Sequence, residues 1–120
     1  MKIFGHPWLP SEMFYPVSSI EEIKKTPPNS TVELKPLSFS LKLAHYCHQN
    51  HISYALEVNI IKDALFANQM GCRYIISDKS LAKELMPIAQ NYLFDTQILA
   101  KIEEDSEIEA LAKDGVDGVI

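Results

Sequence analysis

Three carboxylates occupy comparable places in the sequence, because each lies at or just after the end of a predicted strand. Glu57 lies near the end of the run ISYALEV, Asp78 follows YIIS, and Glu103 follows QILAKI. If the three side chains converge, they could hold Mg²⁺ or act as a general acid and base.

The same carboxylates also have a structural explanation. Asp78 would cap a helix, and the other two would pair with neighbouring lysines, of which the sequence offers Lys35, Lys79 and Lys101. Acidic residues are common at helix starts, where they offset the positive end of the macrodipole. We therefore favour the structural explanation.

A second group with chemical potential is the stretch HYCHQNH. It places His45, Cys47, His48 and His51 within seven residues, a composition typical of transition-metal ligands. His45 and His48 would share one helix face, so they are the metal-ligand candidates. The alternative, which we favour, is structural. The imidazoles would lie near the C-terminus of a helix, where the macrodipole favours cationic side chains, and Asn50 would be the C-cap.

The segment Gly5–Val17 (GHPWLPSEMFYPV) is unusually long for a connection in an α/β protein. Such connections usually have about 2–6 residues, and longer ones are often lids or binding loops. This one contains three prolines and three aromatic residues in thirteen positions. Its aromatic residues, Trp8, Phe14 and Tyr15, either pack over the sheet edge, which we favour, or face a ligand.

Several function classes lack support. The chain carries a net charge of −5 and a single arginine, Arg73, so it lacks the cations that nucleic-acid binding requires. It contains no GxGxxG, GxxxxGK[ST] or GxSxG motif, and we predict no cofactor. No apolar run approaches the roughly 20 residues that span a bilayer, and two cysteines are too few for a disulfide scaffold. We therefore expect one cytoplasmic domain covering residues 1–120, with no membrane or nucleic-acid partner.

Short apolar runs and helical stripes alternate along the chain. The predicted strands are 3–4, 31–34, 52–58, 74–77, 97–102 and 116–120. Helices are predicted from Ser18-Ser19 to Lys25, over 39–49, from Asn59 to Gly71, after Asp78 or Ser80, and from a Ser106 capping box to Gly115. Pro87 should kink or break the fourth helix.

Strands separated by helices pair in parallel through right-handed crossovers, and ligands bind beyond the carboxyl ends of such strands. The candidate ligand-binding residues at that edge are His6, Trp8, Tyr15, Lys35, Glu57, Asn59, Asp78, Lys79, Ser80, Lys101 and Glu103.

Part of the chain is similar to the 2-keto-3-deoxy-6-phosphogluconate aldolase family of βα barrels. The similar stretches are Gly71–Ser77 (GCRYIIS), Ser106-Glu107-Ile108 and Gly115–Val119 (GVDGV), within about two-fifths of the chain. The resemblance implies βα-barrel local structure. The family's Schiff-base lysine would fall at Ile120, which cannot form an imine, and Asp78 replaces a proline of the family pattern, so aldolase chemistry is not implied.

The predicted fold is α/β, with repeated βα units and a mainly parallel sheet of about six strands in a three-layer α/β/α sandwich. The alternative is a partial βα barrel completed by a second copy, since a homodimer would cover the apolar strand that ends in Ile120.

The predicted function is non-catalytic binding of a small ligand or a protein at the strand C-terminal edge. The first alternative is a small lyase or isomerase that uses the carboxylates and His6. The second is metal binding through His45 and His48.

Overall fold

The computed structural model describes residues 1–120 and contains one sheet of seven parallel strands. The order of the strands in the sheet is β1-β7-β6-β5-β4-β3-β2. The strands are β1 (Lys2–Ile3), β2 (Phe14–Pro16), β3 (Thr31–Leu34), β4 (Tyr54–Glu57), β5 (Tyr74–Ser77), β6 (Gln97–Ala100) and β7 (Gly118–Val119).

Five α-helices and one 3-10 helix connect these strands. They are α1 (Ile20–Lys25), α2 (Leu37–Gln49), α3 (Ile61–Met70), α4 (Lys79–Asn91), η1 (Asp105–Glu107) and α5 (Ile108–Lys113).

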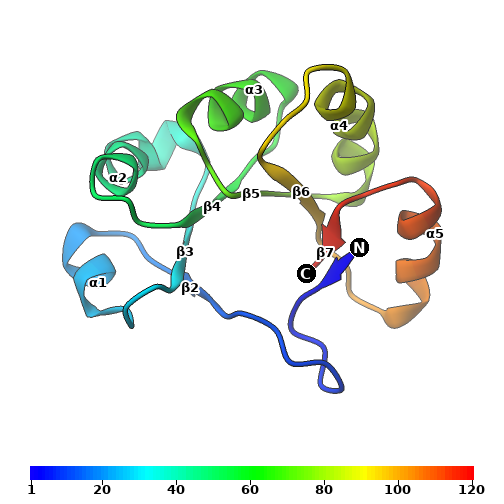
Figure 1. Cartoon of the computed structure of the whole chain (residues 1–120), viewed down its shortest axis with the longest axis horizontal. Helices are drawn as coiled ribbons and strands as arrows, with labels where there is room; N and C mark the ends of the chain where they lie inside the picture. The colour runs from blue at the N-terminus through cyan, green and yellow to red at the C-terminus, as the bar shows by residue number, and fades with distance from the viewer.

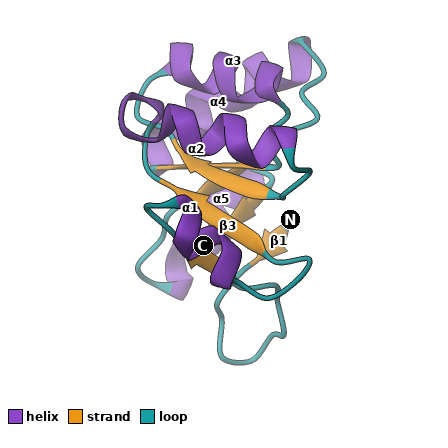
Figure 2. Ribbon diagram, turned by 90° about the vertical axis from the view of Figure 1, so that its left-hand side faces the viewer, coloured by secondary structure: helices purple, strands orange, loops and turns teal.

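The sheet is curled into a half-barrel. From β2 to β7 each strand lies beside the next one in the chain, and the helices lie outside the curl (Figures 1 and 2). The prediction of repeated βα units with a parallel sheet is confirmed, and the partial barrel is the arrangement observed. The predicted three-layer sandwich is wrong, because helices cover only the outer face of the sheet (Figure 1). Side chains of the strands and of the segment after β1 pack together on the concave face.

Alternation along the strands sorts side chains between the two faces. In β5, Ile75 faces the helices and belongs to a core cluster of 24 buried residues. Its neighbours Tyr74 and Ile76 face the concave side, where they pack with Phe4 and Leu99 in a second, smaller cluster. Both faces of the central strands are therefore buried, as parallel strands require.

Strand β2 is the main element that the sequence did not reveal. It lies inside the segment Gly5–Val17 and pairs with β3, with Phe14 opposite Thr31. Its residues, Phe14-Tyr15-Pro16, are too few to show alternation, and Pro16 argues against a strand interior. Pro16 is tolerated here because β2 is an edge strand of the sheet.

The open side of the half-barrel lies between β1 and β2, and residues 4–13 cross it (Figure 1). The Phe4 and Phe14 rings, 5.1 Å apart, meet across this side. Glu12 anchors the crossing segment, because its carboxylate accepts hydrogen bonds from the Tyr74 hydroxyl at 2.5 Å and from the Thr31 hydroxyl at 3.1 Å.

Most helix boundaries follow the predicted signals, with three exceptions. Helix α3 begins after Ile60, so Asn59 does not cap it as predicted. Helix α4 does not break at Pro87 but continues to Asn91. The predicted Ser106 capping box forms instead between Glu104 and Glu107, at the start of η1. Gly71 ends α3 in the left-handed conformation, at φ 84°, as predicted from its position.

None of the helices has the length and apolar character that crossing a membrane requires.

Candidate functional site

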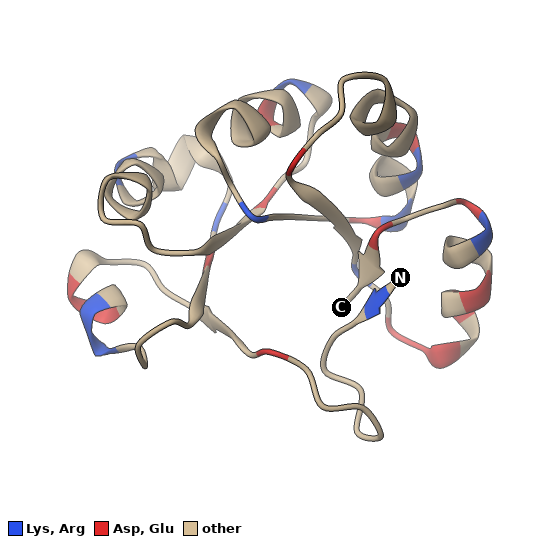
Figure 3. Ribbon diagram, in the orientation of Figure 1, with Lys and Arg blue, Asp and Glu red and all other residues tan.

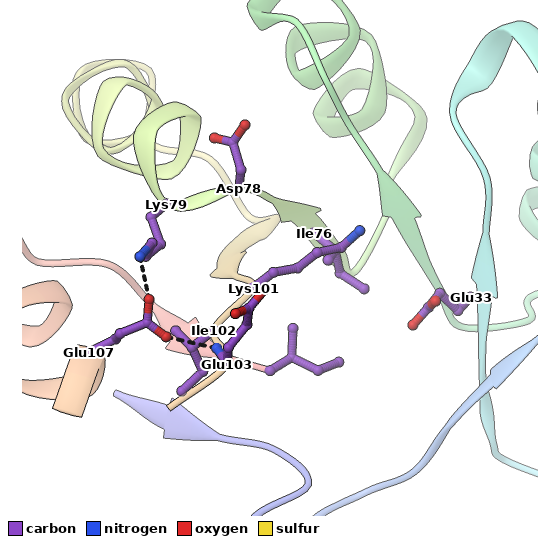
Figure 4. Close-up of a pocket in the computed structure, with 9 residues that line it drawn as sticks. Glu33, Ile76, Asp78, Lys79, Lys101, Ile102, Glu103 and Glu107 are labelled. Atoms are coloured by element: carbon purple, nitrogen blue, oxygen red, sulfur yellow. Dashed lines mark hydrogen bonds and ion pairs between the residues drawn. The ribbon is translucent and has the colours of Figure 1, made fainter. Parts of the chain in front are cut away.

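The carboxyl ends of the parallel strands meet at one edge, which we call the mouth of the half-barrel. A cavity of about 590 Å³ opens there and is the mouth cavity. It is lined by Glu33, Ile76, Asp78, Lys79, Lys101, Ile102, Glu103, Glu107 and Ile120 (Figure 4). Three isoleucines and six charged side chains form these walls.

Glu33 is positioned by the alternation of β3. Its neighbours Val32 and Leu34 are buried in the cluster beneath the helices, so Glu33 faces the concave side. Figure 4 shows it on the opposite wall of the cavity from Lys79 and Glu107. No hydrogen bond or ion pair joins its carboxylate to another side chain.

Burial is the main reason that the pKa of Glu33 lies above the usual value of 4.5. The positive charge of Lys101 opposes this shift, and the negative charge of Glu57 adds to it. Burial penalises the charged form, so the fold disfavours ionisation of Glu33.

The two lysines of the mouth cavity are already paired. Lys101 Nζ lies 3.1 Å from Glu57 Oε1, and Lys79 Nζ donates to Glu107. Glu107 also accepts backbone hydrogen bonds from Glu103 at 2.7 Å and from Glu104 at 3.0 Å. The Lys79 bond and these two N–H groups lower the pKa of Glu107 to about 2.

The turn that carries Glu107 is rich in acidic residues. Four acidic residues lie within the five positions that precede α5, namely Glu103, Glu104, Asp105 and Glu107 (Figure 3). The carboxylates of Glu104 and Glu107 both turn back onto this turn, and Glu107 is the one that also pairs with Lys79. The mouth therefore has a firmly held ion pair on one wall and the unpaired Glu33 on the other.

Three smaller cavities adjoin the mouth cavity, because each shares Glu33 or Ile120 with it. One of about 190 Å³ is lined in part by Lys35 and Glu57, and one of about 230 Å³ by Glu12 and Phe14. The third, of about 170 Å³, contains His6.

Both ring nitrogens of His6 are engaged. Nδ1 accepts a hydrogen bond from the Trp8 backbone N–H at 3.1 Å, and Nε2 lies 2.9 Å from Asp105 Oδ2. Because Nδ1 accepts, the ring proton sits on Nε2 and is donated to Asp105. His6 thus ties the segment that crosses the open side to η1, and neither of its nitrogens is free to act as a base.

The predicted ligand-edge residues separate into three groups. The residues that line the mouth cavity are Asp78, Lys79, Lys101 and Glu103. The residues that line an adjoining cavity are His6, Lys35 and Glu57. The residues that line none of these four cavities are Trp8, Tyr15, Asn59 and Ser80.

The structural explanation of the carboxylates holds for two of the three. Asp78 caps α4 by accepting a hydrogen bond from the Leu81 N–H at 2.7 Å, and Glu57 pairs with Lys101. Glu103 has no lysine partner, because Lys79 pairs with Glu107 instead. Trp8 does not pack over the sheet, since 86% of it is exposed, whereas Phe14 packs against Phe4 and Tyr74.

The structure does not gather metal ligands. No group of three or more His, Cys, Asp or Glu side chains is placed to hold a metal ion. The convergence of Glu57, Asp78 and Glu103 on one ion is therefore wrong, and His45 and His48 have no third ligand beside them.

Sequence reasoning missed two charged residues of the site, Glu33 and Glu107. The signal for Glu33 was present, because in TVEL the glutamate alternates with the apolar residues that face the helices. For Glu107, the sequence indicated only a place in the predicted Ser106 capping box. Its pairing with Lys79 depends on how α4 and η1 approach each other, which the sequence does not show.

A separate cavity of about 400 Å³ lies at the opposite edge of the sheet, lined in part by His51 and Arg73. Arg73 already has partners within the protein, because its guanidinium lies 3.7 Å from Glu12 Oε1 and over the Tyr74 ring. This edge therefore has a structural reason for its charges.

Comparison of the chain with protein-family models and with curated proteins gives no match.

Proposed function

We propose that this protein binds a small polar molecule in the mouth cavity. The observation that carries the proposal is Glu33, a partly buried carboxylate without a protein partner that faces a cavity of about 590 Å³. Binding sites for small molecules usually have volumes of about 300–1,000 Å³, with a few polar groups on apolar walls.

The energetics of Glu33 support this proposal. A carboxylate that is partly removed from water and has no hydrogen-bond donor within the protein costs free energy. A ligand that donates hydrogen bonds to Glu33 would remove the penalty, while Ile76, Ile102 and Ile120 would bury its apolar part.

A second candidate function is acid–base catalysis of the lyase or isomerase type. The raised pKa of Glu33 favours it, since a carboxylate whose pKa is shifted toward neutrality is a better general base. Lys101, beside Glu57, would stabilise negative charge developing on a substrate. His6 has no part in this candidate, because both of its nitrogens are engaged.

A thermal-shift screen of amines, polyols, sugars, amino acids and organic acids tests the binding proposal. We expect compounds that raise the unfolding temperature of the wild-type protein to lose that effect in Glu33→Gln. They should keep it in Glu84→Gln, which removes the same charge from the exposed face of α4. Equal shifts in the wild type and in Glu33→Gln would overturn the proposal.

The same compounds distinguish binding from catalysis. Incubation with the protein in D₂O, followed by proton NMR, would reveal exchange of carbon-bound protons if Glu33 acts as a base. Exchange that Glu33→Gln abolishes would establish the catalytic candidate, whereas binding without exchange would establish the first.

We further propose a cytoplasmic location and a homodimer. The location is supported by the cysteines. Both are free, and burial raises the pKa of Cys47 to about 11 and that of Cys72 to about 12, so both remain thiols.

The homodimer is supported by exposed apolar side chains. The segment across the open side exposes Trp8 and Met13, which a second copy would cover. Native mass spectrometry would report the dimer.

A further inference from the structure

We propose that the ligand of the mouth cavity is a small cationic amine. This inference rests on the proposed function, since it names the chemical class of the molecule that would bind there. It follows from which charged groups of the cavity are already paired within the protein and which are not.

Each lysine of the cavity already has a carboxylate partner that balances its charge. Lys79 is held by Glu107, and Lys101 is held by Glu57 at 3.1 Å. The N-terminus of α4 also reaches the cavity, but Asp78 already accepts its Leu81 N–H at 2.7 Å. An anionic ligand would therefore meet positive charges that carboxylates of the protein already balance.

The negative charges are available. Glu33 and Glu103 line the cavity, and neither side chain is paired with a cation. The lining has four carboxylates and two ammonium groups, an excess of two negative charges. The adjoining cavity contributes two further carboxylates, Glu22 and Glu57, and one ammonium group, Lys35, so it does not reduce this excess. The field in the cavity therefore attracts cations.

The apolar walls match the remainder of an alkyl amine. Ile76, Ile102 and Ile120 lie between the charged walls, and a chain of methylene groups would bury its surface against them. An ammonium group on such a chain can reach a carboxylate while the chain stays in apolar contact.

Binding of a cation would favour the charged form of Glu33. A proton is then released on binding wherever Glu33 is protonated in the free protein, so amine affinity should rise as the pH increases above about 4.5. The other charged groups that line the mouth cavity and its neighbours around Glu33 are Glu12, Glu22, Lys35, Glu57, Asp78, Lys79, Lys101, Glu103 and Glu107. Because Glu33→Gln removes the titrating group, the contribution of Glu33 to this linkage should be lost in the variant.

Three probes with the same four-carbon chain test the charge class. They are putrescine, which is a dication, erythritol, which is neutral, and succinate, which is a dianion. Methyl NMR of isoleucine-labelled protein would be recorded with each probe. We expect putrescine to shift the methyl signals of Ile76, Ile102 and Ile120 but not that of Ile60, which is exposed at the start of α3.

Variants assign the effect to Glu33. We expect Glu33→Gln to weaken putrescine binding by about tenfold or more, the cost of losing a hydrogen bond to a charged group. Glu84→Gln should bind as the wild type does. Thermal unfolding of both variants would confirm that each is folded, and the gain in putrescine affinity with pH should be absent in Glu33→Gln.

The other outcomes separate this inference from the proposed function. Succinate or erythritol shifting the three methyl signals, with putrescine inactive, would overturn the cationic class and still support a ligand site at the mouth. No shift with any of the three probes would overturn this inference, whereas the proposed function would be decided by the wider thermal-shift screen.

Discussion

Glu33 is partly buried because the two residues beside it are needed on the other face of β3. Val32 and Leu34 complete the core beneath the helices, and strand geometry then directs the glutamate toward the concave side. The carboxylate faces a cavity rather than packed side chains, so it keeps some solvent and remains unpaired. An ionisable residue that lowers the stability of the fold and faces a cavity is a candidate for a functional residue.

The stability of the protein should therefore depend on Glu33 and on pH. Because the pKa of Glu33 is raised in the folded state, the folded protein binds more protons than the unfolded chain as the pH rises through and above 4.5. Glu33 then opposes folding at neutral pH. We expect Glu33→Gln to raise the free energy of unfolding at pH 7 by at most about 1 kcal/mol.

Urea unfolding at several pH values would measure this difference. The advantage of Glu33→Gln should disappear well below pH 4.5, where Glu33 is protonated in both the folded and the unfolded state. Glu84→Gln should show no such dependence on pH. A Glu33→Gln variant less stable than the wild type at pH 7 would mean that the carboxylate makes favourable contacts.

Single residues were predicted from the sequence when a local interaction decided their role. Asp78 was expected to cap a helix, and it does, because the capped N–H belongs to Leu81, three residues away. Glu57 was expected to pair with one of three lysines, and the sequence could not choose among them. The choice of Lys101 depends on the sheet order, which places the ends of β4 and β6 on either side of β5 at the mouth.

The elements were predicted better than their ends and edges. The range of β3 and that of β5 match the prediction, because each is a compact run of apolar or β-branched residues. Strand β2 was missed because a three-residue edge strand containing proline has no pattern of its own. It forms because β3 offers a partner, and such a partner becomes visible only in the folded sheet.

Helix α4 shows how tertiary packing overrides a local signal. Pro87 removes one backbone N–H and crowds the carbonyl of Lys83, four residues earlier, yet the helix continues past it. The apolar face of the helix, including Leu81, Leu85 and Ala89, is buried against the sheet. This burial offsets the cost of the proline.

Replacing this proline should stabilise the protein. Pro87 is exposed, so Pro87→Ala restores a hydrogen bond without leaving a cavity. We expect the free energy of unfolding to rise by about 1–3 kcal/mol, because alanine has a much higher helix propensity than proline. The greater freedom of the unfolded chain without the proline opposes this gain by a smaller amount. Chemical denaturation would measure the change, with Glu84→Ala as the control on the same helix. An unchanged or lower stability would show that Pro87 fits the helix without strain.

At the scale of the whole molecule, the repeating βα units determined the parallel sheet, but not its curvature. A sandwich and a partial barrel share the same units and differ in whether helices cover one face or two. The concave face here is closed by Phe4, Phe14 and Tyr74, whose rings lie 5.1–5.5 Å apart. Phe4 and Phe14 come from opposite ends of the irregular segment, so no periodic pattern could reveal that they meet.

This curvature is also what creates the mouth. In the curled sheet, the end of β3 faces the ends of β6 and β7, so Glu33 can share one cavity with Lys101 and Ile120. The sequence identified the correct edge and four of the nine lining residues. The others depend on which strands face one another across the half-barrel.

The central claim is that Glu33 is a partly desolvated carboxylate at this mouth with no partner in the protein. An NMR titration of the side-chain carboxyl groups tests it directly, without any ligand. We predict that Glu33 titrates above 4.5, while Glu107, held by Lys79 and two backbone N–H groups, titrates near 2 in the same spectra. A Glu33 midpoint at or below 4.5 would contradict the account, because it would show a solvated or paired carboxylate.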